Sequence, residues 1–369
     1  MEVFVCGGAV RDIIMRFEPK DIDFVVVNSN HDEMVSNGFK RVGLDFPVYL
    51  HPETGDEYAL ARTEVKTSPG YNGFSCETTD VSLVQDLSRR DCTCNSIAVK
   101  IEDWEQFKIT KCNQLIIDPF NGQADIHNKV LKHTSEAFQQ DPVRVLRVAR
   151  FAARYNFTVH SDTLELMKNI VHELNHVPTE RIWMEFAKGL MEPHPHIMFQ
   201  TLQAVGAFDV DIMKPYYRNE EVSSFFTRVE LLQRYSNNIK SLPGRFALIG
   251  SDFTDAEYNT HRIPNDCKEL SKIVNVYGMQ LSMFSAFNAD FRLQLIMNIR
   301  AISRPEFVHH VMDVVDAVWN NRTDDERNQL FKDLSDIKTV DAETIAVKFK
   351  KGDIIKDQLF NARVAAMSW

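Results

Sequence analysis

The sequence predicts an α/β domain at its N-terminal end, followed by a long all-helical region. Two short β-prone runs, 3–6 and 24–27, flank a Gly-Gly pair and a segment, 9–16, whose apolar residues have helical spacing. This order of strand, glycine turn, helix and strand predicts a sheet covered by helices. Further along, the apolar residues recur at helical spacing in the segments 164–174, 181–190, 198–205, 222–240, 267–299 and 306–318.

Two aspartates enter the second of these strands. Asp21 and Asp23 are two residues apart, so their side chains project from the same face of an extended chain. Adjacent carboxylates repel each other unless a cation lies between them, and Mg²⁺ prefers carboxylate and phosphate oxygens. The Gly7-Gly8 turn lets phosphates approach the backbone, and Arg11 follows within the next helical turn. A Gly-Gly pair alone is more often only a turn, and an Asp-x-Asp alone is more often exposed to solvent. Together they predict a site for Mg²⁺ and a nucleoside triphosphate.

Length and composition indicate a globular enzyme of two or three domains. The chain has 369 residues, of which 44% are hydrophobic and 25% are charged. Its net charge of -10 argues against a generally nucleic-acid-binding surface, so any basic patch must be local. No membrane span or export signal is recognised, and the six cysteines lack the spacing of a zinc site. We therefore expect a cytoplasmic protein with free thiols.

The segment 45–76 is rich in proline and glycine and carries one alternating run, 57–65. Both a mobile flap beside the carboxylates and an ordinary surface loop fit this composition. Glu57, at the start of the run, is a candidate third carboxylate from a neighbouring strand.

A second informative stretch places Arg89, Arg90 and Asp91 shortly before an apolar element, 95–99. Burial of that element is expected to hold the polar residues in place. Adjacent arginines most often form a solvated face. Beside a metal-bound triphosphate they would instead reach phosphate or ribose oxygens, with Asp91 acting as an acceptor or orienting an arginine.

A third stretch, 138–157, predicts a helix that carries a row of arginines. Asp141 suits the N-cap position and Pro142 the first helical position. A carboxylate accepts the exocyclic amino proton of cytosine or adenine, and a guanidinium donates to the ring acceptor beside it. Asp141 with Arg144 would therefore select these two bases; an N-cap aspartate in an ion pair with Arg144 is the alternative. Spacings of three, three and four residues place four arginines on one face: Arg144, Arg147, Arg150 and Arg154.

Taken in order, five motifs closely resemble those of the class II tRNA nucleotidyltransferases of bacterial type, the CCA-adding enzymes. The resemblance implies a head domain of the polymerase-β nucleotidyltransferase type over 1–135, a helical neck over 136–205, and an all-α body and tail over 206–369. The motifs are Gly7-Gly8-x-x-Arg11-Asp12, Asp21-x-Asp23, Arg89-Arg90-Asp91, Asp118-Pro119-x-x-Gly122 and Asp141-Pro142-Val143-Arg144-Val145-Leu146-Arg147.

The resemblance also implies roles for these residues. Asp21 and Asp23 would be the catalytic carboxylates that bind Mg²⁺. The activity implied is the addition or repair of CCA at the 3′ end of tRNA, from CTP and ATP, without a nucleic-acid template and with release of pyrophosphate. The partner implied is the acceptor arm of tRNA with its 3′ end, and no membrane. The residues implied to bind CTP and ATP are Gly8, Arg11, Arg90, Asp91, Asp141, Arg144 and Arg147.

Two departures from the family pattern modify these expectations. The family usually has Glu before Asp141; here Gln140 keeps an acceptor oxygen but loses the charge that braces an arginine, so looser base selection is expected. Many bacterial relatives carry a phosphohydrolase domain with a His-Asp pair. The corresponding region here, 245–274, has Gly250-Ser251-Asp252 in place of that pair. We therefore expect no metal-dependent phosphohydrolase activity.

Three alternatives remain for the function. A bacterial poly(A) polymerase shares the head fold, but the segment 43–48 resembles the CCA-adding version. An enzyme that adds only CC is disfavoured by the length of the segment 45–76. A catalytically inactive tRNA-binding protein would be expected to lose a metal carboxylate or the glycine turn, which this chain keeps. The basic, aromatic segment 348–369 is either a solvated tail or a contact to the tRNA backbone.

Overall fold

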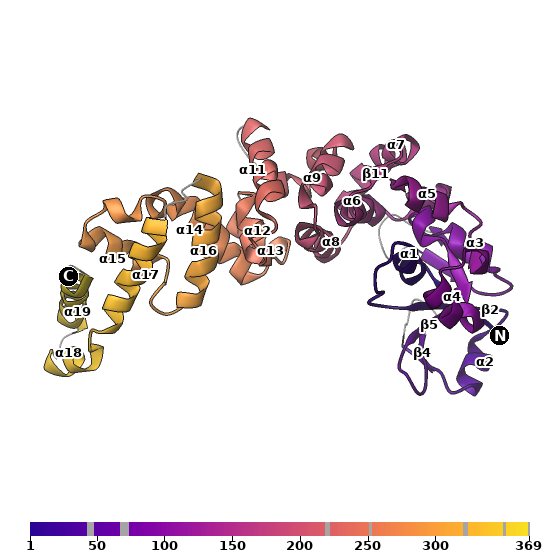
Figure 1. Ribbon diagram of the computed structural model, residues 1–369, viewed down its shortest axis with the longest axis horizontal. Coiled ribbons are helices and arrows are strands. Elements are labelled where there is room, and N and C mark those ends of the chain that lie inside the picture. Colours follow the sequence, from indigo (N-terminus) through magenta and orange to yellow (C-terminus); the bar gives the residue numbers. More distant parts are fainter. Residues whose placement is uncertain are drawn as a thin grey trace. The chain divides into compact units, whose positions relative to one another are not determined.

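The structure, a computed structural model, describes residues 1–42, 48–66, 74–217, 222–250, 253–319, 324–349 and 352–367 (Figure 1). The chain divides into two compact units, Met1–Lys214 and Pro215–Trp369. Within the described ranges, no helix is long and apolar enough to cross a membrane. Some residues used in the sequence predictions lie outside these ranges, namely 43–47, 67–73, Ser251, Asp252, Lys350, Lys351 and Trp369.

A seven-stranded mixed sheet forms the centre of the first unit. Neighbouring strands are antiparallel except for the parallel pair β2 and β5. The strands predicted at 3–6 and 24–27 are confirmed as β1 and β2, which lie side by side. In spatial order the strands are β3 (Lys40–Arg41), β4 (Val48–Leu50), β5 (Glu57–Leu60), β2 (Asp23–Val27), β1 (Glu2–Cys6), β8 (Ala98–Lys100) and β9 (Ile116–Ile117).

Apolar side chains cover both faces of this sheet, because residues along β1 and β2 alternate between the two faces. On one face, Phe4 and Cys6 of β1 and Val25 of β2 pack with Leu87 of α3 (Leu83–Ser88). Burial of each large aliphatic or aromatic side chain contributes roughly 1.5–3 kcal/mol, so these contacts hold β2, and with it Asp23, in place. The cluster on the other face consists of Val26, Met34, Phe39, Tyr49 and Leu60.

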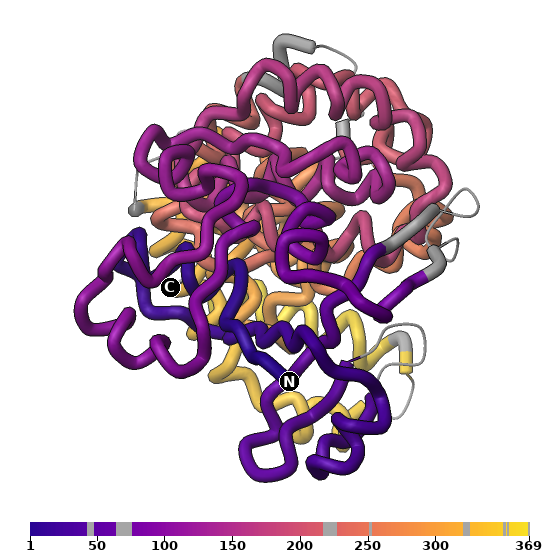
Figure 2. The backbone as a smooth tube through the Cα atoms, turned by 90° about the vertical axis from the view of Figure 1, so that its right-hand side faces the viewer, coloured from indigo at the N-terminus to yellow at the C-terminus, as the bar shows by residue number. Residues whose placement is uncertain are grey.

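Helices surround the sheet and extend the first unit beyond it. The apolar side of α6 is fully buried, and the helix packs against α8 and α9. Figure 2 shows the course of the backbone from the N-terminus through these elements. Two small sheets pair β6 (Thr63–Lys66) with β7 (Phe74–Glu77) and β10 (Val130–Leu131) with β11 (Thr158–Val159). The other helices here are α1 (Gly8–Ile14), α2 (His31–Ser36), α4 (Trp104–Thr110), α5 (Gly122–Asn128), α6 (Val143–Tyr155), α7 (Ser161–Ile170), α8 (Thr179–Met191) and α9 (Pro195–Ala204).

Two local predictions differ from the structure. The alternating run 57–65 is not one strand, since β5 and β6 belong to different sheets; the Ala61 N–H still donates to the Val26 carbonyl oxygen at 2.8 Å before the chain leaves the sheet. The turn predicted at 118–122 is also the start of a helix that the sequence analysis missed. Asp118 accepts hydrogen bonds from the N–H groups of Gly122 and Gln123, at 2.7 and 2.9 Å, and so caps the first turn of α5.

Gly122 permits a close approach between α5 and the segment after Asp91. A Cβ at this position would lie 2.2 Å from the carbonyl oxygen of Thr93. Because main-chain atoms cannot swing away, Gly122→Ala is expected to lower the free energy of unfolding by about 2–3 kcal/mol. Denaturant unfolding measures this difference. Gly352→Ala is the control, since its Cβ would meet nothing within 4 Å; equal stability of the two variants would contradict the close approach.

Every described element of the second unit is helical, as predicted for the body and tail, whereas the neck predicted to be all-α over 136–205 also contains β11 (Thr158–Val159), so the remainder is mostly helical. In its centre, α12 packs against α14 and α16. Gly278 of α14 allows the ring of Trp319 to approach, because a Cβ there would lie 2.3 Å from Cη2 of the ring. The helices are α10 (Lys214–Tyr217), which begins at the end of the first unit, α11 (Val222–Tyr235), α12 (Leu242–Leu248), α13 (Asp255–Thr260), α14 (Asn265–Leu281), α15 (Ala289–Asn298), α16 (Pro305–Trp319), α17 (Asp324–Lys338), α18 (Ala342–Lys348) and α19 (Gly352–Met367).

Candidate active site

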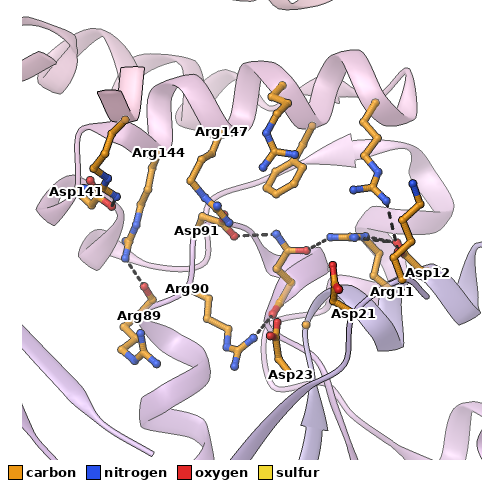
Figure 3. A pocket seen from close by; sticks show the side chains of 18 of the residues that line it. Arg11, Asp12, Asp21, Asp23, Arg89, Arg90, Asp91, Asp141, Arg144 and Arg147 are labelled. Carbon is orange, nitrogen blue, oxygen red and sulfur yellow. Dashed lines mark hydrogen bonds and ion pairs between the residues drawn. The ribbon is translucent and has the colours of Figure 1, made fainter. Parts of the chain in front are cut away.

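A cavity of about 620 Å³ in the first unit brings all the predicted site residues together. Its volume is typical of sites for small molecules. Ten of its lining side chains are Lys or Arg and five are Asp, so this acidic protein has a local basic patch suited to a polyanion. The predicted residues that line it are Gly8, Arg11, Asp21, Asp23, Arg90, Asp91, Asp141, Arg144 and Arg147 (Figure 3). The other described lining residues are Gly7, Asp12, Lys20, Arg62, Arg89, Asn95, Arg150, Phe151, Arg154 and Arg181.

Asp21 and Asp23 lie at this cavity with exposed side chains (Figure 3). Asp23 is the first residue of β2 and pairs with Cys6 of β1, whereas Asp21 precedes the strand. Among the described residues, neither carboxylate has a hydrogen-bond or ion-pair partner, so their oxygens are available to a cation. Glu57 begins the neighbouring strand β5 but is not one of the described residues that line the cavity.

The glycine turn leaves room for Arg90. Gly7 has a φ of +74°, and a Cβ there would lie 2.6 Å from Nη1 of Arg90. Arg90 donates to Oδ2 of Asp86 and to the carbonyl oxygen of Asn95, each at 3.4 Å. Its Nε is buried and has no hydrogen-bond partner in the described part of the chain. A ligand oxygen would satisfy this donor.

Asp86 positions the pair Arg89 and Arg90. Its carboxylate is fully buried and accepts hydrogen bonds from Nη2 and Nε of Arg89, at 2.6 and 3.1 Å. Burial alone would raise the pKa of Asp86, but the charges of Arg89 and Arg90 outweigh it, and the pKa is lowered. The two arginines are therefore held by a buried anion, and they do not form a solvated face.

Asp91 orients Arg147, which is one of the two roles expected for this carboxylate. Oδ2 of Asp91 accepts from Nε of Arg147 at 2.8 Å and lies 2.7 Å from its Nη2. Burial would raise the pKa of Asp91, but the charge of Arg147 and hydrogen bonds from Asn95 and Arg147 lower it. The charge of Asp91 in turn raises the pKa of Arg147. The pair is therefore ionised throughout the physiological pH range.

Arg11 is buried, and each of its three guanidinium nitrogens has a partner. Nε and Nη2 donate to Oδ1 of Asp12 at 2.9 and 2.8 Å, and Nη1 donates to Oδ1 of Asn95. The guanidinium carbon also lies 4.7 Å from the centre of the Tyr155 ring. Arg11 is thus rigidly placed where it lines the cavity.

Asp141 lies at the start of α6 and is fixed by two contacts. Its Oδ1 accepts from the Val143 N–H at 3.1 Å, and its Oδ2 lies 3.4 Å from Nη2 of Arg181 in α8. The ion pair of Asp141 is with Arg181 and not with Arg144, so the alternative based on an Asp141–Arg144 pair is wrong. Pro142 occupies the N-cap position, which makes the helix begin one residue later than predicted.

Arg144 is held by main-chain oxygens. It donates to the carbonyl oxygens of Ala137 and Arg89, each at 2.6 Å. Oε1 of Gln140 is buried and has no hydrogen-bond partner among the described residues. Arg144 is therefore supported even though position 140 lacks the carboxylate usual in the family.

Three positioning residues escaped the sequence analysis: Asp86, Asn95 and Glu185. Asp86 precedes Arg89 by three residues on α3, and this helical spacing was a usable signal. Asn95 follows Asp91 by four residues, but nothing local indicates that its side chain contacts Arg11. Glu185 is buried and accepts from Nε of Arg150 at 2.6 Å, across 35 residues of sequence, so its role required the fold.

The comparisons with known proteins show the family of this chain. Two family models match the chain: the poly A polymerase head domain over residues 3–132, and the probable RNA and SrmB-binding site of polymerase A over 156–212. A Multifunctional CCA protein of Methylobacillus flagellatus is 37% identical and aligns over 100% of this chain and 97% of its own length. This chain belongs to the bacterial class II CCA-adding enzymes.

Solved structures of CCA-adding enzymes share the fold. A CCA-adding enzyme in complex with ATP has a TM-score of 0.72, covering 99% of this chain and 86% of that one, at 21% identity. The Bacillus stearothermophilus CCA-adding enzyme in complex with CTP has a TM-score of 0.71, covering 99% of this chain and 88% of that one, at 19% identity. The polymerase-β-type head with a helical remainder is therefore the fold of CCA-adding enzymes.

The described parts of the region 245–274, where the sequence analysis expects no phosphohydrolase activity, pack as a helical core. Its histidine, His261, is buried, and Nδ1 lies 3.1 Å from the hydroxyl of Tyr216. Burial lowers the pKa of His261. Across the described residues of both units, no group of three or more His, Cys, Asp or Glu side chains could hold a metal ion. His261 thus belongs to the aromatic core around Tyr216 and Phe253.

Proposed function

We propose that this protein adds C, C and A in turn to the 3′ end of tRNA, using CTP and ATP without a nucleic-acid template. The observation that carries the proposal is that the pair Asp21 and Asp23, the basic patch and the pair Asp141 and Arg144 line one cavity. The near-full-length match to a protein named Multifunctional CCA protein supports it.

Mg²⁺ fits the carboxylates at the edge of this site. Asp21 and Asp23 are exposed and lack partners among the described residues, and their oxygens are ligands that a hard cation accepts. When bound, Mg²⁺ lowers the pKa of the 3′-hydroxyl of tRNA and neutralises charge on the leaving pyrophosphate. Asp21 and Asp23 are the residues that would hold it.

The basic side chains account for binding of the triphosphate. The 3′-oxygen of tRNA attacks the α-phosphorus, the bond from that phosphorus to the bridging oxygen breaks, pyrophosphate leaves, and the hydroxyl proton passes to solvent. Nε of Arg90, beside the glycine turn, is buried without a hydrogen-bond partner among the residues that the structure describes, and Asp86 keeps the guanidinium in place. Arg90 therefore binds phosphate or ribose oxygens without reorganising when the nucleotide arrives.

The pair Asp141 and Arg144 accounts for the choice of base. Asp141 accepts the exocyclic amino proton of cytosine or adenine, and Arg144 donates to the adjacent ring acceptor. Uracil and guanine present the opposite pattern at these positions. Contacts with Arg181 and with main-chain groups fix both side chains. Neither side chain can therefore move to form hydrogen bonds with uracil or guanine.

Incubation of the purified protein with Mg²⁺ and a tRNA that lacks its last three nucleotides tests the proposal. CTP and ATP are supplied separately and together, and the 3′ ends are sequenced. We expect CC from CTP alone and CC followed by one A from the mixture, with UTP and GTP refused. The same reaction without Mg²⁺ is the control.

Other products would identify a different enzyme. A poly(A) polymerase is the second candidate, since the matching head-domain model carries that description; it would add a run of A to any of these ends. Termination after CC in the presence of ATP would indicate a CC-adding enzyme. Absence of any product, with tRNA still bound in a mobility-shift assay, would indicate a binding protein.

A further inference from the structure

A closed ring of hydrogen bonds and ion pairs joins the head to α6 at two points. The two α6 residues of the ring, Arg147 and Arg154, are seven positions apart and therefore lie on the same face, about two turns from each other. Both line the cavity, as do the four other members. In order, the ring consists of Arg147, Asp91, Asn95, Arg11, Asp12 and Arg154.

One half of the ring runs from α6 to Asn95. Arg147 contacts Oδ2 of Asp91 at 2.7 Å, and Nδ2 of Asn95 donates to the other oxygen, Oδ1, at 2.8 Å. Oδ1 of Asp91 also accepts from the Cys92 N–H at 2.8 Å. Asp91 therefore has both oxygens engaged, and its position depends on Asn95 as well as on Arg147.

The other half runs from Asn95 back to α6. Oδ1 of Asn95 accepts from Nη1 of Arg11, and Arg11 contacts Asp12 at 2.8 Å. Oδ2 of Asp12 lies 3.6 Å from Nη2 of Arg154, which closes the ring on α6. The hydroxyl of Tyr155 donates to Oδ1 of Asp12 at 3.4 Å. Figure 3 shows Asp91, Arg147, Arg11 and Asp12 in this arrangement.

Asn95 is the uncharged member of the ring, and its chemistry suits its two neighbours. An amide carries an acceptor and a donor on one planar group, so it accepts from the Arg11 cation and donates to the Asp91 anion at once. It is 7% exposed, which makes an unmatched polar contact costly. A carboxylate at this position would still accept a hydrogen bond from Arg11 but would repel Asp91. An aliphatic side chain of similar shape would form a hydrogen bond with neither residue.

We propose that Asn95 is a positioning residue that sets α6, and therefore the base-selecting pair, relative to the triphosphate side of the cavity. The kinetic part of this inference rests on the proposed function, whereas the structural part, the position of α6, does not. With Asn95 in place, Arg11 beside the glycine turn and Arg147 on α6 are linked by three successive contacts, Arg11 to Asn95, Asn95 to Asp91 and Asp91 to Arg147. Without it, Arg147 still contacts Asp91, but the hydrogen bonds that join Asp91 to Arg11 across the cavity are lost.

The variant Asn95→Asp tests this inference, with Asn128→Asp as the matched control on an exposed position of α5. The first measurement is hydrogen exchange of the α6 amides, 143–155, in the whole protein without nucleotide. The second is kcat and KM for CTP and ATP on a tRNA acceptor. We expect at least about 10-fold faster α6 exchange and about a 10- to 100-fold fall in kcat/KM for Asn95→Asp only.

A pH series distinguishes positioning from general damage. The charged groups facing the introduced carboxyl are Arg11 from α1, and Asp91, Arg90 and Arg147. When protonated, a carboxyl again offers an acceptor to Arg11 and a donor to Asp91. The defect relative to the unmodified protein should therefore be largest at high pH and shrink as pH falls below the pKa of the introduced carboxyl.

The outcomes separate the inference from the function. Unchanged α6 exchange in Asn95→Asp would overturn the inference, whatever the activity. A kinetic defect that is independent of pH and accompanied by general unfolding would overturn it as well. If the unmodified protein added no nucleotides, the proposed function would fail, and the exchange measurement alone would still decide the role of Asn95.

Discussion

Asp23→Asn is expected to lower the rate of nucleotide addition by about 10³-fold or more while leaving the fold intact. The proposed role of Asp23 is to hold Mg²⁺, whose charge stabilisation is worth several kcal/mol in the transition state. Its side chain is exposed and has no partner among the described residues. Removing its charge therefore breaks no structural contact there, and the unfolding midpoint should not change.

Single-turnover incorporation of CTP, at saturating tRNA and Mg²⁺, measures this effect, and Asp21→Asn should behave in the same way. Asp32→Asn, at an exposed position of α2 in the same unit, is the control for charge alone. Near-normal incorporation by Asp23→Asn would show that the metal assignment is wrong. Loss of activity together with a lower unfolding midpoint would instead indicate a structural role.

Asp141→Asn is expected to lower the preference for CTP over UTP by about 100-fold. A carboxylate only accepts hydrogen bonds, whereas an amide presents an acceptor or a donor depending on which way it is turned. The amide can donate to the carbonyl oxygen that uracil carries where cytosine has its amino group. This oxygen is then no longer left unpaired in the site, so UTP is no longer rejected on that ground.

The ratio of kcat/KM for CTP to that for UTP measures this selectivity on one tRNA acceptor. The substitution keeps an acceptor for the Val143 N–H, so the start of α6 should be preserved. Asp162→Asn, on an exposed position of α7, is the control. An unchanged ratio would show that Asp141 does not select the base, even if the overall rate fell.

Arg144 is held in place without a carboxylate at position 140. The sequence predicted looser selection because Gln140 cannot pair with an arginine. In the structure, Arg144 is held by the carbonyl oxygens of Ala137 and Arg89 at 2.6 Å. Main-chain oxygens near the ends of two rigid elements position a guanidinium independently of the side chain at 140, so strict selection remains the expectation for the CTP and UTP measurement.

The local units of the first sheet and the candidate site residues could be predicted from the sequence alone. β1, the glycine turn, α1 and β2 follow one another within 27 residues, and their apolar pattern, glycine pair and aspartates are readable because each signal depends on near neighbours. The same holds for the arginine row on α6. All nine residues predicted from these signals line the cavity.

The contacts that hold those residues in place could not be predicted from the sequence, because they join residues far apart in it. Asp91 and Arg147 are 56 positions apart, Arg11 and Asn95 are 84 apart, and Arg150 and Glu185 are 35 apart. No periodicity links such pairs, because their contact depends on how the sheet, α6 and α8 pack. The ionisation of Asp91, the support of Arg144 by main-chain oxygens and the central place of Asn95 all follow from that packing, since most buried polar groups are paired with whatever partners the fold supplies.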